Sequence, residues 1–277
     1  MDLASEIERN VTAALAEDVG RGDWTAQLTP AGATSSAHVI CRTAAVIAGQ
    51  PWFDAVFRNL EASTKIQWHT AEGQRVAPGT RLCSLTGVTR SLLTGERTAL
   101  NFLQTLSAVA TLTRTYVDAV TGTQAAILDT RKTLPGLRVA QKYAVETGGG
   151  VNHRMGLYDA ILIKENHIAA AGGITAALAE AKHIAPADVW VQVEVENMQQ
   201  LDEALGAGAT LVLLDNMNAA QMRQAVIHTA GRAKLEASGG ITLENVREIA
   251  LTGVDRISIG ALTKDIKAVD LSMRFAA

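Results

Sequence analysis

The stretch Val189–Asp215, VWVQVEVENMQQLDEALGAGATLVLLD, decides the fold. It begins with valines that alternate with polar residues, which is typical of a β-strand with one apolar face. Residues 198–205 then carry apolar side chains at helical spacing, and Leu211–Asp215 is a second apolar run. A strand, a helix and another strand in this order predict two parallel strands joined by a crossover helix.

The same alternation extends to both sides of this stretch. Further strands are predicted at Ala125–Thr130, Ala160–Lys164, Leu235–Ser238 and Arg256–Ile259, and helices at Pro135–Glu146, Thr175–Ile184, Ala219–Thr229 and Thr242–Leu251. This pattern predicts a (β/α) barrel, complete or nearly so. A doubly wound open sheet is the alternative, because alternation along the sequence does not show whether the sheet closes.

The first hundred residues follow a different pattern. The spacing predicts helices at Ile7–Asp18 and Pro51–Leu60, with strands at His38–Ile47, Lys65–His69 and Arg81–Leu85. This mixture indicates an α+β module, and a helical segment, Leu92–Val120, leads out of it. We therefore expect an N-terminal α+β domain, residues 1–107, and a barrel domain, residues 108–277, whose C-terminal tail could return to the first domain.

Composition excludes several classes of protein. The chain has 277 residues, 48% of them hydrophobic and 19% charged, so it is too apolar for disorder and too long for a mini-protein. A net charge of −3 provides no basic field for nucleic acid or for an anionic membrane. Two cysteines form no disulfide framework and favour the cytoplasm, and no leader-like or 18-residue apolar run predicts secretion or a membrane span.

Charged residues follow the predicted strands at their carboxyl ends, where (β/α) barrels place their active sites. They are Asp129, Arg131, Lys132, Lys164, Glu165, His167, Glu194, Glu196 and Asp215. Strand alternation turns Gln192, Glu194 and Glu196 into the barrel, where carboxylates need cationic partners or a metal. The alternatives are solvated loop charges and an edge strand with one wet face.

Two further groups indicate an anionic substrate. Ser238-Gly239-Gly240 and Gly260 end late strands, where backbone N–H groups can hold a phosphate, although ordinary glycine turns would look the same. The second group is cationic and suits a ligand with several negative charges: Arg131, Lys132, Arg138, Lys142, His153, Arg154 and Lys164. Within this group we expect Lys142 to lie on a solvated helix face, and the neighbouring Arg154 favours a binding role for His153.

These motifs, taken in order, resemble the quinolinate phosphoribosyltransferase family over nearly the whole chain. The resemblance rests on Glu96–Asn101 (ERTALN), Asp129–Arg138 (DTRKTLPGLR), Gly148–Asp159 (GGGVNHRMGLYD), Lys164–His167 (KENH), Glu194–Glu196 (EVE), Leu214–Met217 (LDNM) and Glu236–Ile241 (EASGGI). One departure is Glu165, where many relatives have aspartate. Because Lys164 is retained beside it, the departure leaves the expected lysine in place.

The resemblance implies an N-terminal open-faced α/β sandwich, an incomplete barrel of about seven strands, and a homodimer in which Arg97 reaches the partner's site. It implies that quinolinate is bound by Arg97, Arg131, His153, Arg154 and Lys164, with Thr133 in the same substrate-binding motif. It implies that Lys132 and Lys164 contact phosphoribosyl pyrophosphate (PRPP), and that Glu194 and Asp215 hold its ribose and Mg²⁺. Finally, it places the 5′-phosphate on Ser238, Gly239, Gly240 and Gly260.

The implied reaction makes nicotinate mononucleotide, pyrophosphate and CO₂ for NAD biosynthesis. It fits the charges, because bond breaking leaves a positive sugar carbon and a negative leaving group. Three alternatives remain: a Schiff-base aldolase that uses Lys164, a molybdenum-operon protein of the same fold, and a catalytically silent sensor of pyridine dicarboxylates. The arginines argue against the first alternative, and retention of both Glu194 and Asp215 argues against the sensor.

Overall fold

The computed structural model describes residues 2–276, which form two compact units. Unit 1 consists of residues 2–114, Thr133–Gly149 and 262–276, and unit 2 consists of Thr115–Lys132 and Gly150–Ala261. The chain therefore passes from unit 1 to unit 2 and back twice. No helix among the described residues combines the length and the apolar character that crossing a bilayer requires.

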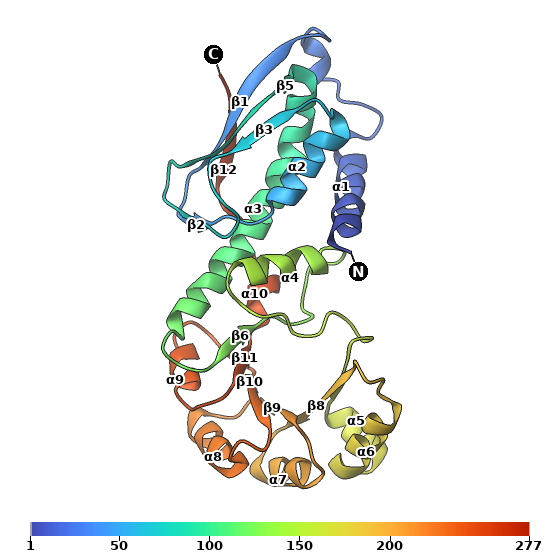
Figure 1. The fold of residues 1–277 in the computed structure, drawn as a ribbon, viewed down its shortest axis with the longest axis vertical. Coiled ribbons are helices and arrows are strands. Elements are labelled where there is room, and N and C mark those ends of the chain that lie inside the picture. The colour runs from blue at the N-terminus through green and yellow to red at the C-terminus, as the bar shows by residue number, and fades with distance from the viewer. Residues whose placement is uncertain (1, 277) are drawn as a thin grey trace. The chain divides into compact units, whose positions relative to one another are not determined.

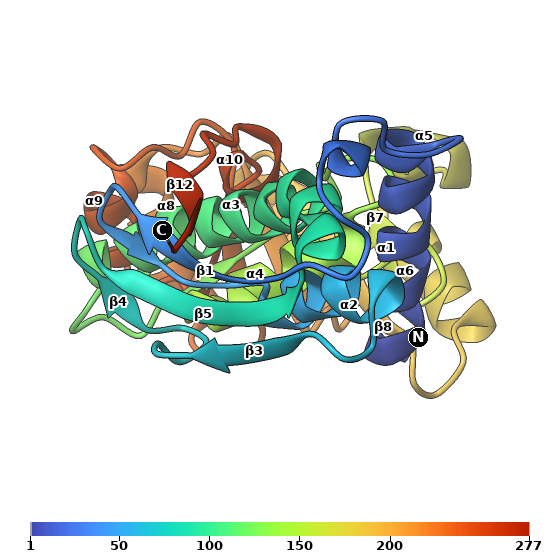
Figure 2. The same ribbon diagram turned by 90° about the horizontal axis from the view of Figure 1, so that it is seen from above.

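Unit 1 is built on a four-stranded antiparallel sheet in the order β12-β1-β5-β3, with strands Leu271–Phe275, Thr34–Cys41, Arg81–Val88 and Lys65–Trp68. Two short strands, β2 (Ala45–Val46) and β4 (Arg75–Val76), pair separately. Seen from above, helix α3 (Thr89–Ala119) runs along one face of the sheet (Figure 2). The C-terminal strand β12 pairs with β1 from Ala37 to Cys41.

Helices α1 (Leu3–Val19), α2 (Gln50–Leu60) and α4 (Arg138–Thr147) complete unit 1. The core between sheet and helices includes the fully buried Trp52, Phe53 and Phe57 of α2. Gly95 lets α3 approach α2 closely, because a Cβ at this position would lie 2.8 Å from the Phe57 ring. A short 3₁₀ helix, Ala26–Leu28, precedes β1.

Unit 2 contains six parallel strands in the order β6-β11-β10-β9-β8-β7. They are Ala126–Leu128, Arg256–Ser258, Lys234–Ser238, Leu211–Asp215, Trp190–Val195 and Ala160–Ile163. Helices α6 (Ile174–Ile184), α7 (Met198–Gly206), α8 (Ala219–Thr229) and α9 (Val246–Ala250) lie along the outer side of the strands (Figure 1). The seven-residue helix α5 (Glu165–Ala171) follows β7, and the four-residue helix α10 (Ala261–Lys264) begins at the last residue of unit 2 and continues into unit 1.

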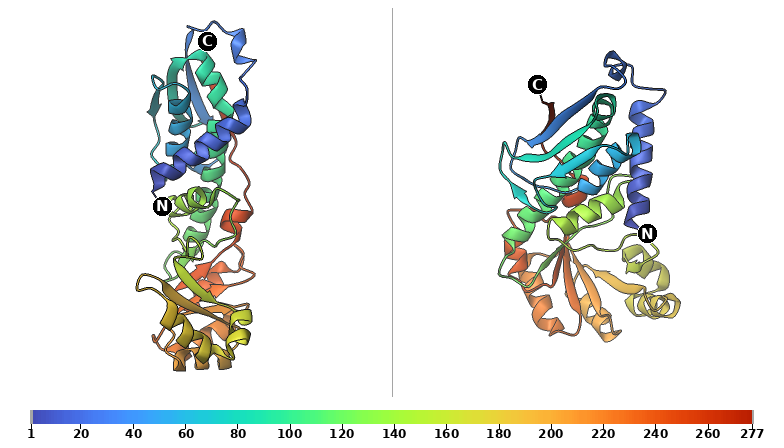
Figure 3. Two further views of the ribbon diagram at one scale, coloured as in Figure 1. Left: turned by 90° about the vertical axis from the view of Figure 1, so that its right-hand side faces the viewer. Right: turned by 45° about the horizontal axis from the view of Figure 1, so that its top comes forward.

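The strand order identifies the sheet as an incomplete barrel. The first strand, β6, pairs with the last, β11, and the remaining strands follow in sequence without the reversal of a doubly wound sheet. Among the described residues no ladder joins β6 to β7, although Val151 forms a single parallel bridge with Leu128. Figure 3, right, shows the strands splayed as a curved sheet with helices along the outer side. The expected α+β unit and incomplete barrel are both confirmed.

Candidate active site

The carboxyl ends of the six parallel strands collect the polar residues of unit 2 at one edge of the sheet. Lys132 lies in the segment after β6, Lys164 directly follows β7, and Glu194 belongs to the end of β8. Asp215 and Ser238 end β9 and β10, and these two residues are register partners. Residues far apart in the sequence thus meet on one face of unit 2.

Lys164 and Glu194 form an ion pair across the ends of β7 and β8. The ammonium Nζ of Lys164 donates to Glu194 Oε2 at 2.8 Å. The carboxylate side chain is only 9% exposed, whereas that of Lys164 is 45% exposed and in contact with solvent. Glu194 is therefore the buried charge of the pair, and Lys164 can turn toward a ligand without being stranded in an apolar interior.

Two guanidinium groups lie close to each other in the segment that follows β6 and precedes β7. Arg154 is buried and donates from Nη1 to the carbonyl of Ala160 at 3.2 Å, whereas Arg131 is exposed. Burial, and then the positive charge of Arg131, lower the pKa of Arg154 against the opposite pull of Asp159. Because neighbouring cations repel each other, an anion placed between them would relieve a cost already present in the protein.

His153 is held on all sides by the interior of the barrel. Its backbone N–H donates to Asp129 Oδ1 at 2.9 Å, and its Nδ1 accepts from the backbone N–H of Arg154 at 2.8 Å. On the other side of the ring, Nε2 lies 3.2 Å from Gln192 Oε1 and 3.4 Å from Glu236 Oε1. Both ring nitrogens are thus used within unit 2.

The turn after β10 is shaped by Asn216 and glycine. Gly239 has φ +93°, and a Cβ there would lie 2.2 Å from Asn216 Oδ1. Asn216 itself has φ 52° and donates from Nδ2 to Asp215 Oδ2 at 2.8 Å. A Cβ added to Gly240, which has φ +62°, would meet no atom within 4 Å, so the space beside this part of the backbone is open.

Lys132 lies against the glycine that follows β11. A Cβ on Gly260 would lie 3.0 Å from Lys132 Cδ, so the bare backbone provides the surface on which the lysine stem lies. The backbone N–H of Lys132 donates to Thr130 Oγ1 at 3.1 Å. The structure thereby brings the predicted Lys132 and Gly260 together.

Two predicted substrate-binding residues, Arg97 and Thr133, belong to unit 1. Arg97 is exposed on α3, and Thr133 Oγ1 accepts from Arg138 Nε at 3.2 Å. The expectation that Lys142 lies on a solvated face is wrong, because its side chain is fully buried. Helix α4 buries residues on more than one face. Its charged and polar residues by themselves indicate a helix with one face in solvent.

The prediction that strand β8 turns three polar side chains into the barrel holds for only two of them. Gln192 and Glu194 are buried, but Glu196 follows the last strand residue and is exposed. Sequence reasoning assigned no role to Gln192, Glu236 or Asn216. The first two could have been found from strand alternation, whereas the left-handed backbone of Asn216 leaves no periodic signal.

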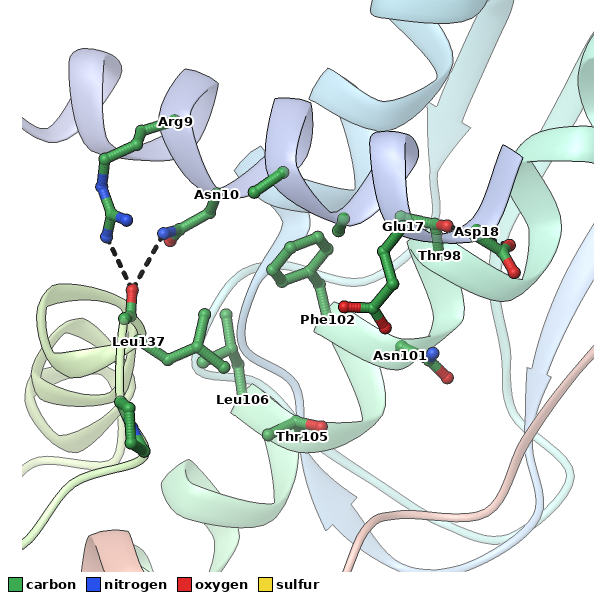
Figure 4. Close-up of a pocket in the computed structure, with 14 residues that line it drawn as sticks. Arg9, Asn10, Glu17, Asp18, Thr98, Asn101, Phe102, Thr105, Leu106 and Leu137 are labelled. Atoms are coloured by element: carbon green, nitrogen blue, oxygen red, sulfur yellow. Dashed lines mark hydrogen bonds between the residues drawn. The ribbon is translucent and has the colours of Figure 1, made fainter. Parts of the chain in front are cut away.

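A cavity of about 370 Å³ lies within unit 1, between α1, α3 and the loop 135–137. Figure 4 shows Arg9 and Asn10 of α1 reaching the loop, where both donate to the carbonyl of Gly136, at 2.7 and 3.1 Å. The α3 side of the cavity is formed by Thr98, Asn101, Phe102, Thr105 and Leu106, which share one face of that helix. Arg97 is the sequence neighbour of this face.

Comparison with known proteins decides the family. Residues 23–107 match the model of the quinolinate phosphoribosyl transferase N-terminal domain, and residues 109–274 match that of the C-terminal domain. The chain belongs to the quinolinate phosphoribosyl transferase family. The two matched ranges together cover most of the described chain, including each strand-end residue discussed above.

Individual members of the quinolinate phosphoribosyl transferase family match along nearly their full lengths. The probable nicotinate-nucleotide pyrophosphorylase [carboxylating] of Synechocystis is 43% identical over 94% of this chain and 89% of its own. The nicotinate-nucleotide pyrophosphorylase [carboxylating] of Mycobacterium leprae is 43% identical over 94% of each chain. The solved nicotinate-nucleotide pyrophosphorylase of Francisella tularensis has a TM-score of 0.94, is 43% identical, and covers 100% of this chain and 98% of that one.

Proposed function

We infer that this chain is a decarboxylating quinolinate phosphoribosyltransferase of NAD biosynthesis. It transfers the phosphoribosyl group of PRPP to the pyridine nitrogen of quinolinate and releases pyrophosphate and CO₂, leaving nicotinate mononucleotide. The observation that carries this conclusion is that unit 2 combines two interacting guanidiniums, Arg131 and Arg154, in the segment between β6 and β7 with Lys164, Glu194 and Asp215 at the ends of β7, β8 and β9. Cations and acids in one site suit a dianionic acceptor and a sugar donor.

Quinolinate has two adjacent carboxylates, and the arginine pair supplies the matching charge. Guanidinium forks bind carboxylates through paired hydrogen bonds, and binding is strengthened where the arginine is buried, as Arg154 is. We assign Arg131 and Arg154 to the carboxylates and His153 and Lys164 to the same acceptor, and we retain Thr133 as a substrate-binding residue of the same motif. A monocarboxylate such as nicotinate would leave part of this charge unmatched.

The donor sugar requires the opposite charge. As the ribose–pyrophosphate bond breaks, the sugar carbon becomes positive, so Glu194 and Asp215 would stabilise it from the ends of β8 and β9. Lys132 and Lys164 would stabilise the leaving pyrophosphate. The open backbone at Gly240, with Ser238, Gly239 and Gly260 as the other residues of this phosphate site, suits the 5′-phosphate because unhindered N–H groups can approach the oxygens.

The donor set also fits Mg²⁺ that arrives with PRPP. Among residues 2–276 no three His, Cys, Asp or Glu side chains cluster as a ready-made cage. Mg²⁺ is usually held by one or two carboxylates together with substrate phosphates and water, which is what Glu194 and Asp215 can offer. When bound, the ion would neutralise charge on the pyrophosphate.

Decarboxylation follows from the product of the transfer. Once the pyridine nitrogen carries the ribose, its positive charge stabilises the electron pair that remains on the adjacent ring carbon as the 2-carboxylate departs as CO₂. The ring carbon then takes a proton in place of the carboxylate. Arg131 and Arg154 would orient the acceptor so that its nitrogen faces the donor.

We further propose a homodimer in which Arg97 completes the partner's acceptor site. Arg97 is exposed, although the next residue, Thr98, is buried. The arginine therefore lies outside the face by which α3 packs in its own unit. The polar residues Asn101 and Thr105 continue beside it along the cavity of unit 1. An exposed arginine next to a hollow is suited to contact with a second copy of the chain.

A cytoplasmic location is also part of the proposal. Both cysteines, Cys41 and Cys83, are free thiols and are buried, and burial raises the pKa of each thiol. Such thiols suit a reducing compartment but do not require one. Fractionation of the source cells would test the location directly.

The proposed reaction is tested by measuring pyrophosphate release with quinolinate, PRPP and Mg²⁺, each omitted in turn. Release should require all three components. Nicotinate in place of quinolinate should give little or no pyrophosphate, because one carboxylate leaves part of the cationic site unmatched. Equal turnover with nicotinate would overturn the assignment.

A further inference from the structure

The segment that carries Arg154 has little regular structure of its own. From Gly148 to Asp159 the chain forms only the single bridge of Val151 with Leu128. Yet the guanidinium at its centre is buried and must meet a ligand at a defined place. An irregular segment can hold such a side chain only if other groups fix its backbone, because flexible loops otherwise sample many conformations.

His153 provides the fixation on the β6 side of Arg154, while Asp159 accepts from the backbone N–H groups of Met155 and Gly156 on the other side. The hydrogen bond from its backbone N–H to Asp129 ties the segment to the end of β6, and its Nδ1 accepts the N–H of Arg154 itself. The orientation of the imidazole therefore determines the peptide from which Arg154 extends. The ring also contacts Trp190 edge-on, with centroids 5.1 Å apart.

The hydrogen bonds assign the proton on the ring. Because Nδ1 accepts from a backbone N–H, the proton of the neutral imidazole is on Nε2. Nε2–H then donates to Gln192 Oε1, and Gln192 Nε2 donates to Glu236 Oε2 at 3.1 Å. The amide of Gln192 has only one consistent orientation, with oxygen toward the histidine and nitrogen toward the acid.

Glu236 ends this series as a buried acceptor. Its side chain is 1% exposed, and its surroundings offer it His153, Gln192 and Ser258. Burial acts to raise the pKa of Glu236, but the hydrogen bonds from these neighbours outweigh burial, so the pKa lies below its ordinary value. The acid therefore remains a carboxylate, an acceptor only, and fixes the direction of both hydrogen bonds.

We propose that Glu236, acting through Gln192 and His153, is a positioning residue that fixes Arg154 and thereby the carboxylate-binding part of the acceptor site. This inference rests on the proposed function and deepens it. Glu236 and Gln192 do not touch substrate in this account. Their loss should weaken quinolinate binding specifically, while the PRPP residues at the ends of β7, β8 and β9 keep their arrangement.

The test exchanges the acid and the amide. Glu236→Gln should raise the quinolinate dissociation constant by at least about tenfold. The new amide has an NH₂ group in place of one carboxylate oxygen, so a buried donor would face the donors of His153 and Gln192. Gln192→Glu should do the same, because two carboxylates would face each other. The double variant restores one acid and one amide in reversed order, so the acid at position 192 accepts from His153 and from the new amide.

We expect the double variant to recover most of the lost affinity. Calorimetric titration with quinolinate, alongside titration with PRPP and Mg²⁺, reads the two sites separately, and circular dichroism melts report folding. PRPP affinity should remain within about threefold of the parent in every folded variant. Turnover of the parent is measured in parallel, so failure of the proposed reaction is seen independently of the binding pattern.

The outcomes separate clearly. Unchanged quinolinate affinity in Glu236→Gln, an equal loss for both substrates, or no recovery in the double variant would overturn the proposal. If Glu236→Gln does not fold, a folded double variant with near-parent quinolinate affinity supports it. If neither folds, the acid serves the stability of the barrel, and the positioning role is rejected.

Discussion

At the level of single residues, the two members of the ion pair in the site differ in burial: the carboxylate is buried and the ammonium group is hydrated. Glu194 is enclosed at the end of β8, and its partner Lys164 remains half exposed. A buried carboxylate needs a cation, whereas a hydrated ammonium can leave its partner at little cost. The pair can therefore open when a charged donor arrives, and we expect it to serve binding more than stability.

The first prediction concerns the two acids. Glu194→Gln and Asp215→Asn should lose PRPP binding and lower kcat by about a hundredfold or more, the scale on which charge stabilisation acts in active sites. Their stability should change by less than about 1 kcal/mol, because Lys164 stays hydrated and Asp215 is partly exposed. Thermal melts and PRPP titrations measure the two effects.

Glu196→Gln is the matched control, because Glu196 is exposed beyond the end of the same strand. It should keep near-parent activity. A Glu194→Gln protein that is unstable but fully active would instead assign Glu194 a structural role.

Strand alternation and strand ends predict much of the residue-scale picture. They place Glu194, Asp215 and Lys164 at one edge of the sheet, because parallel strands end together. They do not show which buried polar residues join each other, since Gln192 and Glu236 come from strands that are not neighbours. Nor do they predict that Lys142 is buried, which depends on what covers α4.

At the scale of elements, short turns and helix contacts decide the geometry. The turn between β10 and α9 is shaped by a left-handed Asn216 that occupies the space beside Gly239. In unit 1, α1 is joined to the loop 135–137 by Arg9 and Asn10, which both donate to Gly136 O. Substitutions of Gly239 and of Asn10 test these two regions separately.

Gly239→Ala should sharply weaken PRPP binding. The new Cβ would collide with Asn216 Oδ1, and the left-handed backbone adds about 1–2 kcal/mol of strain for a residue with a Cβ. Gly231→Ala is the control, because Gly231 has φ +75° but nothing within 4 Å of the added carbon. Equal PRPP affinity in the two variants would remove the Gly239 turn from the phosphate site.

Asn10→Ala should destabilise the protein by about 1–3 kcal/mol, because the fully buried Trp52 Nε1–H would lose the acceptor Asn10 Oδ1 at 3.0 Å. Asn59→Ala is a control of the same chemistry at an exposed position, where a change within about 0.5 kcal/mol is expected. Urea unfolding of both variants makes the comparison. Similar losses of stability in both variants would show that the buried hydrogen bond from Trp52 to the Asn10 side chain adds nothing to the stability of the protein.

The elements themselves were well predicted where periodicity is strong, as in α2, α8 and the strands of unit 2. The helical segment predicted at Leu92–Val120 is a single helix of 31 residues, α3. Helix α9 is shorter than predicted, because residues 239–245 form an irregular connection with a turn before the helix begins at Val246. Strand β12 was not predicted, since its pairing with β1 depends on a partner more than 200 residues away in the sequence.

At the scale of the whole molecule, the order of the strands excludes the open-sheet alternative. The pairing of the first barrel strand with the last, β6 with β11, is a long-range contact that no local pattern encodes. The chain also returns to unit 1 after each of its two excursions into unit 2. The domain boundary between residues 107 and 108 remains a prediction. The two compact units are defined by contacts between residues, and each unit contains more than one segment of the chain.

The proposed dimer predicts complementation. Arg97→Ala and Lys132→Ala should each be nearly inactive alone, but mixing them should restore activity through hybrid dimers with one intact site. With equal amounts and random exchange, about a quarter of the parent activity is the upper limit for a twofold dimer. No recovery, with subunit exchange shown independently by mass spectrometry, would mean that Arg97 acts within its own chain.

Isotope labelling distinguishes the two carboxylate carbons of quinolinate in the proposed reaction. With PRPP and Mg²⁺, quinolinate labelled with ¹³C in the 2-carboxylate should release one labelled CO₂ for each pyrophosphate, and label in the 3-carboxylate should stay in the nucleotide. This result follows from a positively charged ring nitrogen that stabilises an electron pair on the adjacent carbon, which bears the 2-carboxylate, and not on the carbon that bears the 3-carboxylate. Pyrophosphate release without labelled CO₂ from the 2-carboxylate, or label lost from the 3-carboxylate, would contradict the assignment of this chain as a decarboxylating quinolinate phosphoribosyltransferase.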